Sequence, residues 1–255
     1  MSAWLEAKVL ENHAWTDALF SLRVALPAGA PSLAFEAGQF VRIGLDLEEG
    51  NAGSRIGRPF SFVNAPGDPV LEFYGIVVPQ GPLSPRLARL AAGDALYIAD
   101  NPAGWLVLSE VPPAEDLWLV ATGTGIAPFL SILATDAPWE KYRRVILVHG
   151  AREARELAYA ERIAELQARR PGRLAYVRFT SRERAGGALE GRIPAAVADG
   201  RLEAAAGAPI APDRSQVMLC GNPDMLRDMT AALAARGLKK HRRRSPGQIT
   251  QESFW

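Results

Sequence analysis

The middle of the chain carries a strand, a tight glycine turn and the start of a helix in immediate succession. The apolar run 117–121 leads into Thr122-Gly-Thr-Gly-Ile-Ala-Pro128, after which apolar residues recur at helical spacing through Leu133. The free backbone N–H groups of such a turn, together with the positive end of the helix dipole, make a site for a phosphate or pyrophosphate group. Because residues 1–116 precede the strand, another folded unit must come before it.

One residue sets this turn apart from the usual dinucleotide-binding pattern. Pro128 occupies the position of the third glycine in G-x-G-x-x-G. Glycine turns between a strand and a helix often serve chain geometry alone. The turn by itself therefore leaves nucleotide binding and a purely geometric role equally open.

The residues before this turn have the pattern of antiparallel β-structure. Short segments rich in Val, Phe, Tyr, Leu and Ile alternate with turns that contain Pro, Gly, Asn and Asp, at spacings that suit a small barrel. The predicted strands are residues 4–10, 18–26, 39–45, 60–64, 71–78 and 95–99. One helix over 84–90 interrupts them, with Ser84 as its expected N-cap and Pro85 as its first helical residue.

After Pro112 and Pro113 the pattern changes to alternating strands and helices, which indicates a parallel sheet built from right-handed crossovers. We therefore predict two domains, an antiparallel β-barrel over residues 1–110 and an α/β domain with a parallel sheet over 111–255. The Ala-rich stretch 202–207 is interpreted as a helix end and a loop. The predicted strands are 117–121, 145–149, 174–180 and 216–220, and the predicted helices follow Pro128 and cover 157–169 and 224–235.

The residues just after the parallel strands are expected to line one crevice, because ligands of such sheets bind at the carboxyl ends of the strands. The second strand lacks the Asp or Glu that an NAD enzyme usually places at its end, and the first charged residue there is Arg152. Arg182 follows the third strand, and Arg192 comes after it. Guanidinium groups suit a 2′-phosphate, so NADP is favoured over NAD. The alternative is that three surface arginines coincide here by chance.

A second signal lies in the predicted barrel, at Arg58-Pro-Phe-Ser61. It joins a cation, an aromatic ring and a hydroxyl on one strand, which are groups that a bound flavin needs for its pyrophosphate, its ring and its N5 atom. The alternative is an ordinary strand with one exposed arginine. Downstream, Gly81-Pro-Leu-Ser84 opens the predicted helix of the barrel and offers a cradle for a second pyrophosphate. Two phosphate sites, one in each domain, imply two nucleotides.

The composition limits the class of protein. With 48% hydrophobic and 22% charged residues, and with no apolar run near the roughly 20 residues that span a bilayer, the chain is typical of a soluble globular protein. It begins with neither the basic start nor the apolar core of a signal peptide, so we expect a cytoplasmic protein. The single cysteine, Cys220, excludes a disulfide framework and a metal site of its own, and the three histidines show no ligand spacing.

The charge pattern limits the partners. The net charge of +1 predicts no general attraction to nucleic acid or to a membrane surface. Lys239-Lys-His-Arg-Arg-Arg244 is nevertheless a compact basic run. It is either a solvated surface segment or a docking patch for an acidic partner or for phosphate groups.

Six motifs, taken in order, resemble those of the ferredoxin–NADP reductases. The resemblance covers essentially the whole chain. The motifs are Arg58-Pro-Phe-Ser61, the stretch from Phe73 to Leu87, Ala121-Thr-Gly-Thr-Gly-Ile-Ala-Pro128, Val148-His-Gly-Ala-Arg152, Gly191-Arg-Ile-Pro194 and Cys220-Gly-Asn-Pro-Asp-Met225. The aromatic end Ser253-Phe-Trp255 and the segment from Trp15 to Phe20 resemble the bacterial subclass of these enzymes.

The resemblance implies an N-terminal FAD-binding barrel and a C-terminal NADP-binding domain whose aromatic tail returns to the flavin. It implies two catalytic residues, Ser61 near flavin N5 and Cys220 near the nicotinamide, although Cys220 alternatively serves only as a small residue that ends a buried strand. The implied FAD-binding residues are Arg58, Pro59, Phe60, Ser61, Tyr74, Val78, Pro82, Leu83, Ser84, Thr124, Phe254 and Trp255. The implied NADP-binding residues are Thr122, Gly123, Arg152, Arg182, Arg192, Asn222, Pro223 and Asp224.

The chain departs from the family at two places. Phe60 stands where the flavin motif usually has Tyr, which keeps a ring for stacking and loses a phenolic hydroxyl. Segment 44–57 has the pattern of a loop somewhat longer than in close relatives, and we assign it no function.

The implied activity is electron exchange between NADPH and a one-electron carrier. NADPH gives a hydride to FAD N5, and single electrons leave to ferredoxin or flavodoxin, an acidic carrier that residues 239–244 guide electrostatically. We expect a monomer without a metal. One alternative is a flavin reductase or an oxygenase reductase component without its own iron–sulfur domain, which a single cysteine cannot build. The other is a non-catalytic NADPH-binding regulator, which would be colourless.

Overall fold

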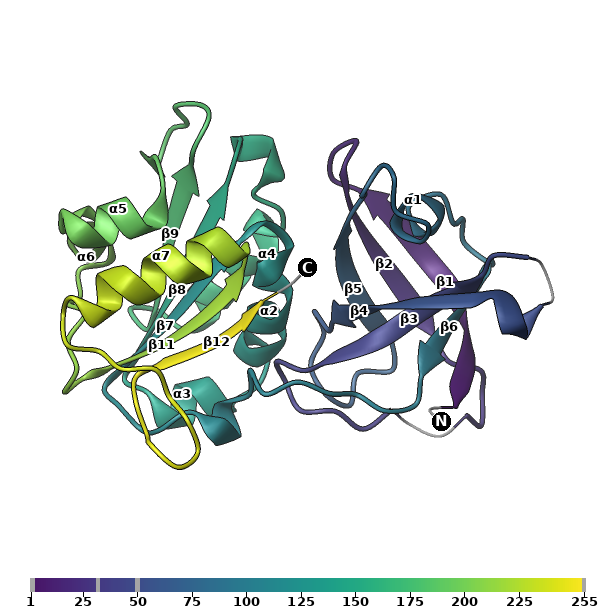
Figure 1. Cartoon of the computed structure of the whole chain (residues 1–255), viewed down its shortest axis with the longest axis horizontal. Helices are drawn as coiled ribbons and strands as arrows, with labels where there is room; N and C mark the ends of the chain where they lie inside the picture. The colour runs from purple at the N-terminus through teal and green to yellow at the C-terminus, as the bar shows by residue number, and fades with distance from the viewer. Residues whose placement is uncertain (1–2, 31–32, 49–50, 254–255) are drawn as a thin grey trace.

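The alternating segments of the N-terminal part form one antiparallel sheet (Figure 1). The computed structural model describes residues 3–30, 33–48 and 51–253. The sheet has the strands β1 (Trp4–Ala14), β2 (Leu19–Ala25), β3 (Phe40–Asp46), β4 (Arg55–Ser61), β5 (Leu71–Ile76) and β6 (Ala95–Ala99), in the order β4-β3-β6-β1-β2-β5. An isolated bridge between Phe62 and Phe73 joins the end of one edge strand to the other edge strand, so the sheet curls into the predicted barrel.

The C-terminal part forms the predicted parallel sheet with helices on both faces. Its strands are β7 (Asp116–Thr122), β8 (Arg144–Ala151), β9 (Leu174–Thr180), β10 (Ala188–Glu190), β11 (Ser215–Gly221) and β12 (Ile249–Ser253). Its helices are α2 (Ala127–Leu133), α3 (Ala137–Lys141), α4 (Ala160–Arg169), α5 (Ile193–Ala198), α6 (Arg201–Ala206) and α7 (Pro223–Ala234). In the order β10-β9-β8-β7-β11-β12, the chain adds β8, β9 and β10 on one side of β7 and then adds β11 and β12 on its other side. Such a switch point in strand order, here between β7 and β11, leaves a crevice at the carboxyl ends of the strands.

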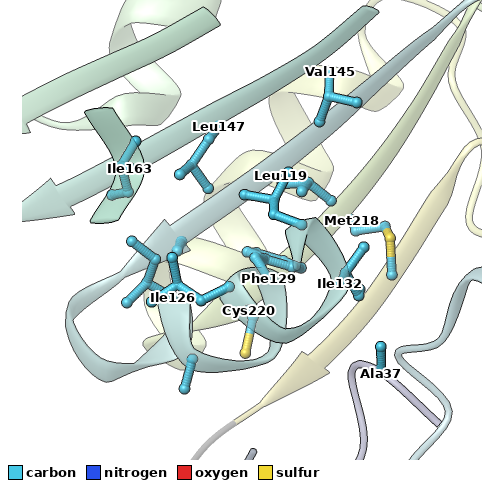
Figure 2. Close-up of a cluster of buried hydrophobic side chains, with 14 of the residues drawn as sticks. Ala37, Leu119, Ile126, Phe129, Ile132, Val145, Leu147, Ile163, Met218 and Cys220 are labelled. Atoms are coloured by element: carbon cyan, nitrogen blue, oxygen red, sulfur yellow. The ribbon is translucent and has the colours of Figure 1, made fainter. Parts of the chain in front are cut away.

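Alternate residues of the central strand β7 face different helical layers. Leu117 and Leu119 pack in one cluster with α2, α3 and α4, whereas Trp118 and Val120 pack in another with α5, α6 and α7. Figure 2 shows the first cluster, where side chains of α2 lie beside Leu119. Because both faces are covered, the strand is apolar throughout, which is why a continuous hydrophobic run marks it in the sequence.

The first cluster continues from the parallel sheet into the barrel. Leu19, Val63 and Tyr74 of the barrel belong to it. Arg162 of α4 adds polar contacts, donating to Glu72 Oε2 at 3.1 Å and to the Val63 carbonyl at 3.0 Å. One hydrophobic core therefore joins the two sheets.

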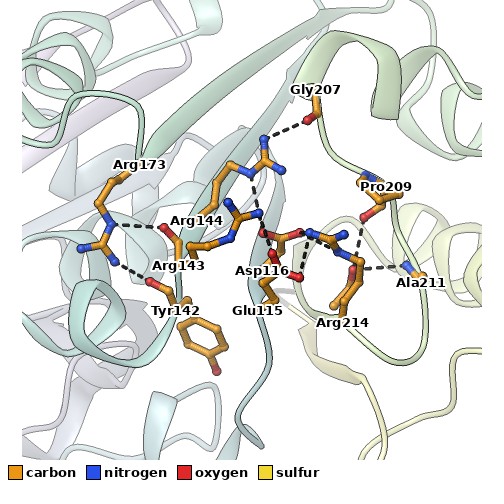
Figure 3. Close-up of polar contacts among 11 residues, drawn as sticks. Glu115, Asp116, Tyr142, Arg143, Arg144, Arg173, Gly207, Pro209, Ala211 and Arg214 are labelled. Carbon is orange, nitrogen blue, oxygen red and sulfur yellow. Dashed lines mark hydrogen bonds and ion pairs between the residues drawn. The ribbon is translucent and has the colours of Figure 1, made fainter.

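An ion-pair network fixes the amino ends of the parallel strands (Figure 3). Asp116 at the start of β7 is fully buried, and its carboxylate lies 2.9 Å from Arg214 Nη2 and 3.6 Å from Arg144 Nε. Glu115 contacts Arg143 and Arg214 at 2.6 and 3.0 Å. Removing one partner of a buried pair leaves an uncompensated charge. The ion pairs therefore stabilise the sheet at the amino ends of its strands. The carboxyl ends lie on the opposite side, where ligands of such sheets bind.

The barrel differs from the sequence prediction in its helix. The helix is α1 (Ser84–Leu87), shorter than 84–90, and Leu83 occupies the N-cap position that we expected for Ser84. The Ser84 hydroxyl instead accepts a hydrogen bond from the Val78 N–H at 2.8 Å. This hydrogen bond closes the loop between Val78 and Ser84. It could not be predicted from the helix-capping preference of serine.

The prediction of a loop over segment 44–57 was wrong only at its two ends. Residues 44–46 end β3 and residues 55–57 begin β4, and the two strands pair as far as Asp46 and Arg55. Arg55 Nε lies 2.7 Å from Asp46 Oδ1, and its guanidinium stacks 3.3 Å from the centre of the Tyr97 ring. The predicted strand 60–64 accordingly lies earlier, as β4. These contacts hold the facing ends of β3 and β4 together.

Four short elements of the α/β part were not predicted, and one helix there was predicted only in part. The unpredicted elements are α3, β10, α5 and β12. Residues 202–207, interpreted as a helix end and a loop, contain the last five residues of α6, which ends at Ala206, and its C-cap Gly207. Of these elements, β12 matters most for function, since it lies beside β11 and runs toward the barrel (Figure 1).

Candidate functional site

A cleft of about 480 Å³ lies at the carboxyl ends of the parallel strands. The residues that follow β7, β8, β9 and β11 line it together, as the strand-end argument predicted. Ala18, Leu19 and Ile76 close it from the barrel side. The cleft therefore lies between the two sheets, at the switch point of strand order.

The structure brings most of the predicted NADP residues together in this cleft. Those that line it are Thr122, Gly123, Arg152, Arg182, Arg192, Asn222 and Asp224. Pro223 does not line it and is the exposed first residue of α7. The predicted FAD residue Thr124 also lines the cleft, on the same turn.

The three arginines of the cleft keep their positive charge available. Arg152, Arg182 and Arg192 are exposed, and none forms an ion pair within the described part of the chain. By contrast, neighbouring Arg155 and Arg184 pair with Glu153 and Glu190 at 2.7 and 3.0 Å. Glu156, Asp224 and Asp228 also line the cleft, and the two aspartates pair with Arg227. The three guanidinium groups thus remain available to an anionic ligand.

The glycine turn is shaped by close contact with the end of β11. Gly123 has φ +54°, in the left-handed region that favours glycine. A Cβ on Gly125 would lie 2.5 Å from the Cys220 carbonyl oxygen, so the two backbones touch. The Asn222 N–H donates to Thr122 Oγ1 at 3.0 Å. The turn is a 3-10 helix over Gly123–Ile126 that leads into α2, and its glycines are needed for this geometry.

In the barrel, two of the predicted FAD residues carry buried polar atoms without a partner. Ser61 Oγ and the Tyr74 hydroxyl are buried and make no hydrogen bond within the described residues. Burial raises the pKa of Tyr74. A buried hydroxyl without a partner costs about 1–3 kcal/mol, so both atoms fit a site that a polar ligand completes.

The remaining barrel residues divide into exposed and buried groups. Phe60 packs in the barrel core, where its ring and that of Phe20 cover Gly75. Leu83 is buried as well, whereas the apolar side chain of Val78 is 48% exposed. Arg58, Pro59 and Pro82 are exposed, and the Arg58 guanidinium donates to the Gly57 carbonyl at 3.0 Å. The barrel thus offers an exposed cation, an exposed valine and two buried hydroxyls without partners, which are groups that suit a ligand with a phosphate and a flat ring.

Cys220 lies in the hydrophobic cluster and not on the cleft wall (Figure 2). Burial, and secondarily the nearby Glu252 carboxylate, raises the pKa of its thiol. Ser61 and Cys220 come from different sheets, β4 and β11. The other two predicted FAD residues, Phe254 and Trp255, lie outside the described residues.

Glu252 is a candidate site residue that the sequence analysis missed. It is the register partner of Cys220 on the neighbouring strand β12. Its Oε2 has no hydrogen-bond partner among the described residues, and burial raises the pKa of the carboxyl to about 7. A Cβ on Gly104 would lie 3.3 Å from Glu252 Oε1, so the carboxyl faces the barrel. The burial of Glu252 could have been predicted only if the polar segment Ile249–Ser253 had been recognised as a strand.

Two kinds of feature are absent from the described residues. These residues contain no helix that is both long and apolar enough to cross a membrane. They also contain no group of three or more His, Cys, Asp or Glu side chains suited to hold a metal ion.

Comparison with known proteins gives the class first. Residues 119–231 match the family model described as an oxidoreductase NAD-binding domain. The parallel sheet, its cleft and this match indicate an oxidoreductase whose α/β domain binds a nucleotide.

The relatives then give the family. The flavodoxin/ferredoxin–NADP reductases of Escherichia coli (strain K12) and Shigella flexneri are each 46% identical to this chain over the full length of both proteins. The crystal structure of a ferredoxin NADP+ reductase from Neisseria gonorrhoeae with bound FAD and NADP is similar with a TM-score of 0.91, at 31% identity over 99% of each chain. The chain belongs to the flavodoxin/ferredoxin–NADP reductase family.

Proposed function

We propose that this protein exchanges electrons between NADPH and a one-electron carrier, ferredoxin or flavodoxin, by means of bound FAD. The observation that carries the proposal is one cleft with three unpaired arginines that opens toward a barrel with orphan hydroxyls. The relatives' names supply the carriers, and the similar crystal structure contains both nucleotides.

The barrel residues are proposed to hold FAD, within a domain over residues 1–110. Arg58 and Ser84 contact its pyrophosphate at the turn that Pro82 and Leu83 shape, and Pro59 and Phe60 support the ring. When bound, FAD accepts two electrons together and releases them one at a time. The residues proposed to complete its site are Ser61, Tyr74, Val78, Thr124, Phe254 and Trp255.

The residues of the cleft are proposed to bind NADP, within a domain over residues 111–255. Arg152, Arg182 and Arg192 grip the 2′-phosphate, since planar guanidinium groups bind phosphate oxygens in pairs. Thr122 and Gly123 meet the cofactor on one wall. Asn222 and Asp224 line the cleft beside them, at the start of α7, and Pro223 supports this turn from outside the cleft. The arginine at the end of β8, in place of an acidic residue, favours NADP over NAD.

Three residues are proposed to act near the reacting atoms. Cys220 lies behind the cleft wall, where it supports the proposed nicotinamide position from within the core, and Ser61 offers its free hydroxyl to the flavin. Glu252 holds or releases a proton, because a carboxyl with a pKa of about 7 exists in both forms at neutral pH.

The basic run 239–244 is proposed to dock the acidic carrier. Of its arginines, Arg243 already pairs with Glu110, so Arg242, Arg244 and the two lysines supply the charge that steers the carrier. We further propose that the protein works in the cytoplasm as a monomer.

A stopped-flow comparison tests the function. NADPH is expected to bleach the yellow protein much faster than NADH, and ferredoxin or flavodoxin is expected to restore the colour. Equal rates with NADPH and NADH would contradict the proposal that the three arginines of the cleft select NADP. A colourless protein would favour a regulator, and transfer only to free flavin would favour a flavin reductase.

A further inference from the structure

A histidine lies directly beneath the glycine turn. His149 on β8 is fully buried, next to Ala121 on the neighbouring strand β7. Its Nε2 lies 3.1 Å from the carbonyl oxygen of Gly123. Its Nδ1 lies 3.5 Å from the hydroxyl of Tyr176 on β9. Nothing in the proposed electron transfer uses this side chain.

The contacts fix the form of the imidazole. A carbonyl oxygen only accepts hydrogen bonds, so Nε2 carries the proton and donates it to Gly123. Nδ1 is then the acceptor and faces the Tyr176 hydroxyl. Burial lowers the pKa of His149 to about 4, so the ring is neutral at physiological pH.

The contact also sets the direction of one backbone N–H. In a trans peptide the C=O and the next N–H point in opposite directions. When His149 holds the Gly123 carbonyl inward, the N–H of Thr124 points away from His149. Thr124 lines the cleft, and the first N–H groups of a helical turn have no partner within that turn.

We propose that His149 is a positioning residue for nucleotide binding, which holds the Gly123 carbonyl so that the turn presents N–H groups and no carbonyl to the NADP phosphates. Tyr176 keeps the ring in the required tautomer. The inference rests on the proposed function, because it needs a phosphate ligand in the cleft. Gly123 has φ +54°, and a glycine populates both signs of φ about equally readily, so this contact is needed to hold one orientation of its carbonyl.

Calorimetric titration of the FAD-loaded protein with NADP+ tests the inference. His149→Phe keeps a ring and removes the donor, and it is expected to weaken NADP+ binding by about three- to tenfold, the usual effect of one hydrogen bond. His149→Gln keeps an N–H donor and is expected to recover most of the affinity. Tyr176→Phe is expected to weaken binding by a smaller factor. The KM for NADPH is expected to follow the same order while kcat changes by less than about twofold.

Val148→Ala is the matched control. Val148 is buried next to His149 but faces the other core cluster. This variant is expected to lower the melting temperature while NADP+ affinity stays unchanged. Nitrogen NMR of the wild-type imidazole is expected to show a neutral ring with its proton on Nε2 at pH 5.

The outcomes separate the two proposals. Wild-type affinity in His149→Phe, or an equal loss in Val148→Ala, overturns the positioning role alone. A wild-type protein that does not bind NADP+ overturns the proposed function and this inference with it.

Discussion

Arg243 forms a two-pronged ion pair with Glu110, with N–O distances of 2.6 and 2.9 Å. Its guanidinium also lies 4.0 Å from the ring centre of Trp105. The pair ties the loop between α7 and β12 to the segment that leaves the barrel. It lowers the pKa of Glu110 through the hydrogen bond from Arg243. Arg243 is therefore engaged within the protein, and Arg242, Arg244 and the two lysines of the run are left for a partner.

This division predicts the effect of neutralising the run. The double variant Arg242→Gln and Arg244→Gln is expected to slow ferredoxin reduction about three- to tenfold at low salt, because rim charges act mainly on association. The difference is expected to vanish at about 0.5 M salt, where charges are screened. Turnover of NADPH with a small dye is expected to stay unchanged, and Arg169→Gln on α4 is the control for loss of a remote charge. An equal fall in both activities would assign the run to structure or to NADP.

The arginines of the cleft are expected to set the choice of cofactor. Arg182→Gln or Arg192→Gln should raise the KM for NADPH about tenfold, the usual effect of a hydrogen bond between charged groups, and leave the KM for NADH nearly constant. Steady-state kinetics with both cofactors measures this. Arg155→Gln serves as the control, since Arg155 is exposed, pairs with Glu153 and does not line the cleft. A similar rise in the KM for NADPH and in the KM for NADH would show that these arginines do not recognise the 2′-phosphate.

Glu252 is expected to make stability depend on pH. Burial raises the pKa of its carboxyl from 4.5 to about 7 in the folded protein. The folded state therefore binds the proton more tightly than the unfolded state, and stability falls as the pH rises from about 4.5 to 7, by up to about 3 kcal/mol. Glu252→Gln removes this loss, so it is expected to melt at a higher temperature than the wild type at pH 8 and not at pH 5. Thermal unfolding at the two pH values measures the difference, and parallel pH profiles would contradict it.

Asp116 is expected to matter for stability and not for the cleft. Asp116→Asn leaves Arg144 and Arg214 without their buried counter-charge, which typically costs about 3–5 kcal/mol and lowers the melting temperature by roughly 10 °C. NADP+ affinity at a temperature where the variant is folded is expected to match the wild type. Asp136→Asn is the control, because its pair with Arg170 is 79% exposed on the carboxylate side. If both variants lowered the melting temperature by similar amounts, burial of the Asp116 network would contribute nothing to stability.

The sequence predicted the elements that depend on local patterns. The strands 95–99 and 174–180 agree with β6 and β9 residue by residue, and the glycine turn follows β7 as expected. The gathering of Arg152, Arg182 and Arg192 also followed from the sequence, because parallel strands end at one edge whatever their order.

What the sequence did not reveal depends on contacts between distant residues. The polar tail Ile249–Ser253 has a weak strand pattern, and its pairing with β11 comes from the folded sheet. Glu252 was missed for that reason, since its burial follows only from the pairing. The role of His149 was hidden likewise, because Gly123 lies 26 residues earlier in the chain.

The shared core has a mechanical consequence. Leu19, Val63 and Tyr74 of the barrel pack in the same cluster as α2 and β7, so swinging the two sheets apart would expose apolar surface to water at about 25 cal/mol for each Å². The shared cluster therefore opposes separation of the two sheets. We expect the nucleotide to enter and leave the cleft through side-chain movements at its mouth, without opening of the two halves.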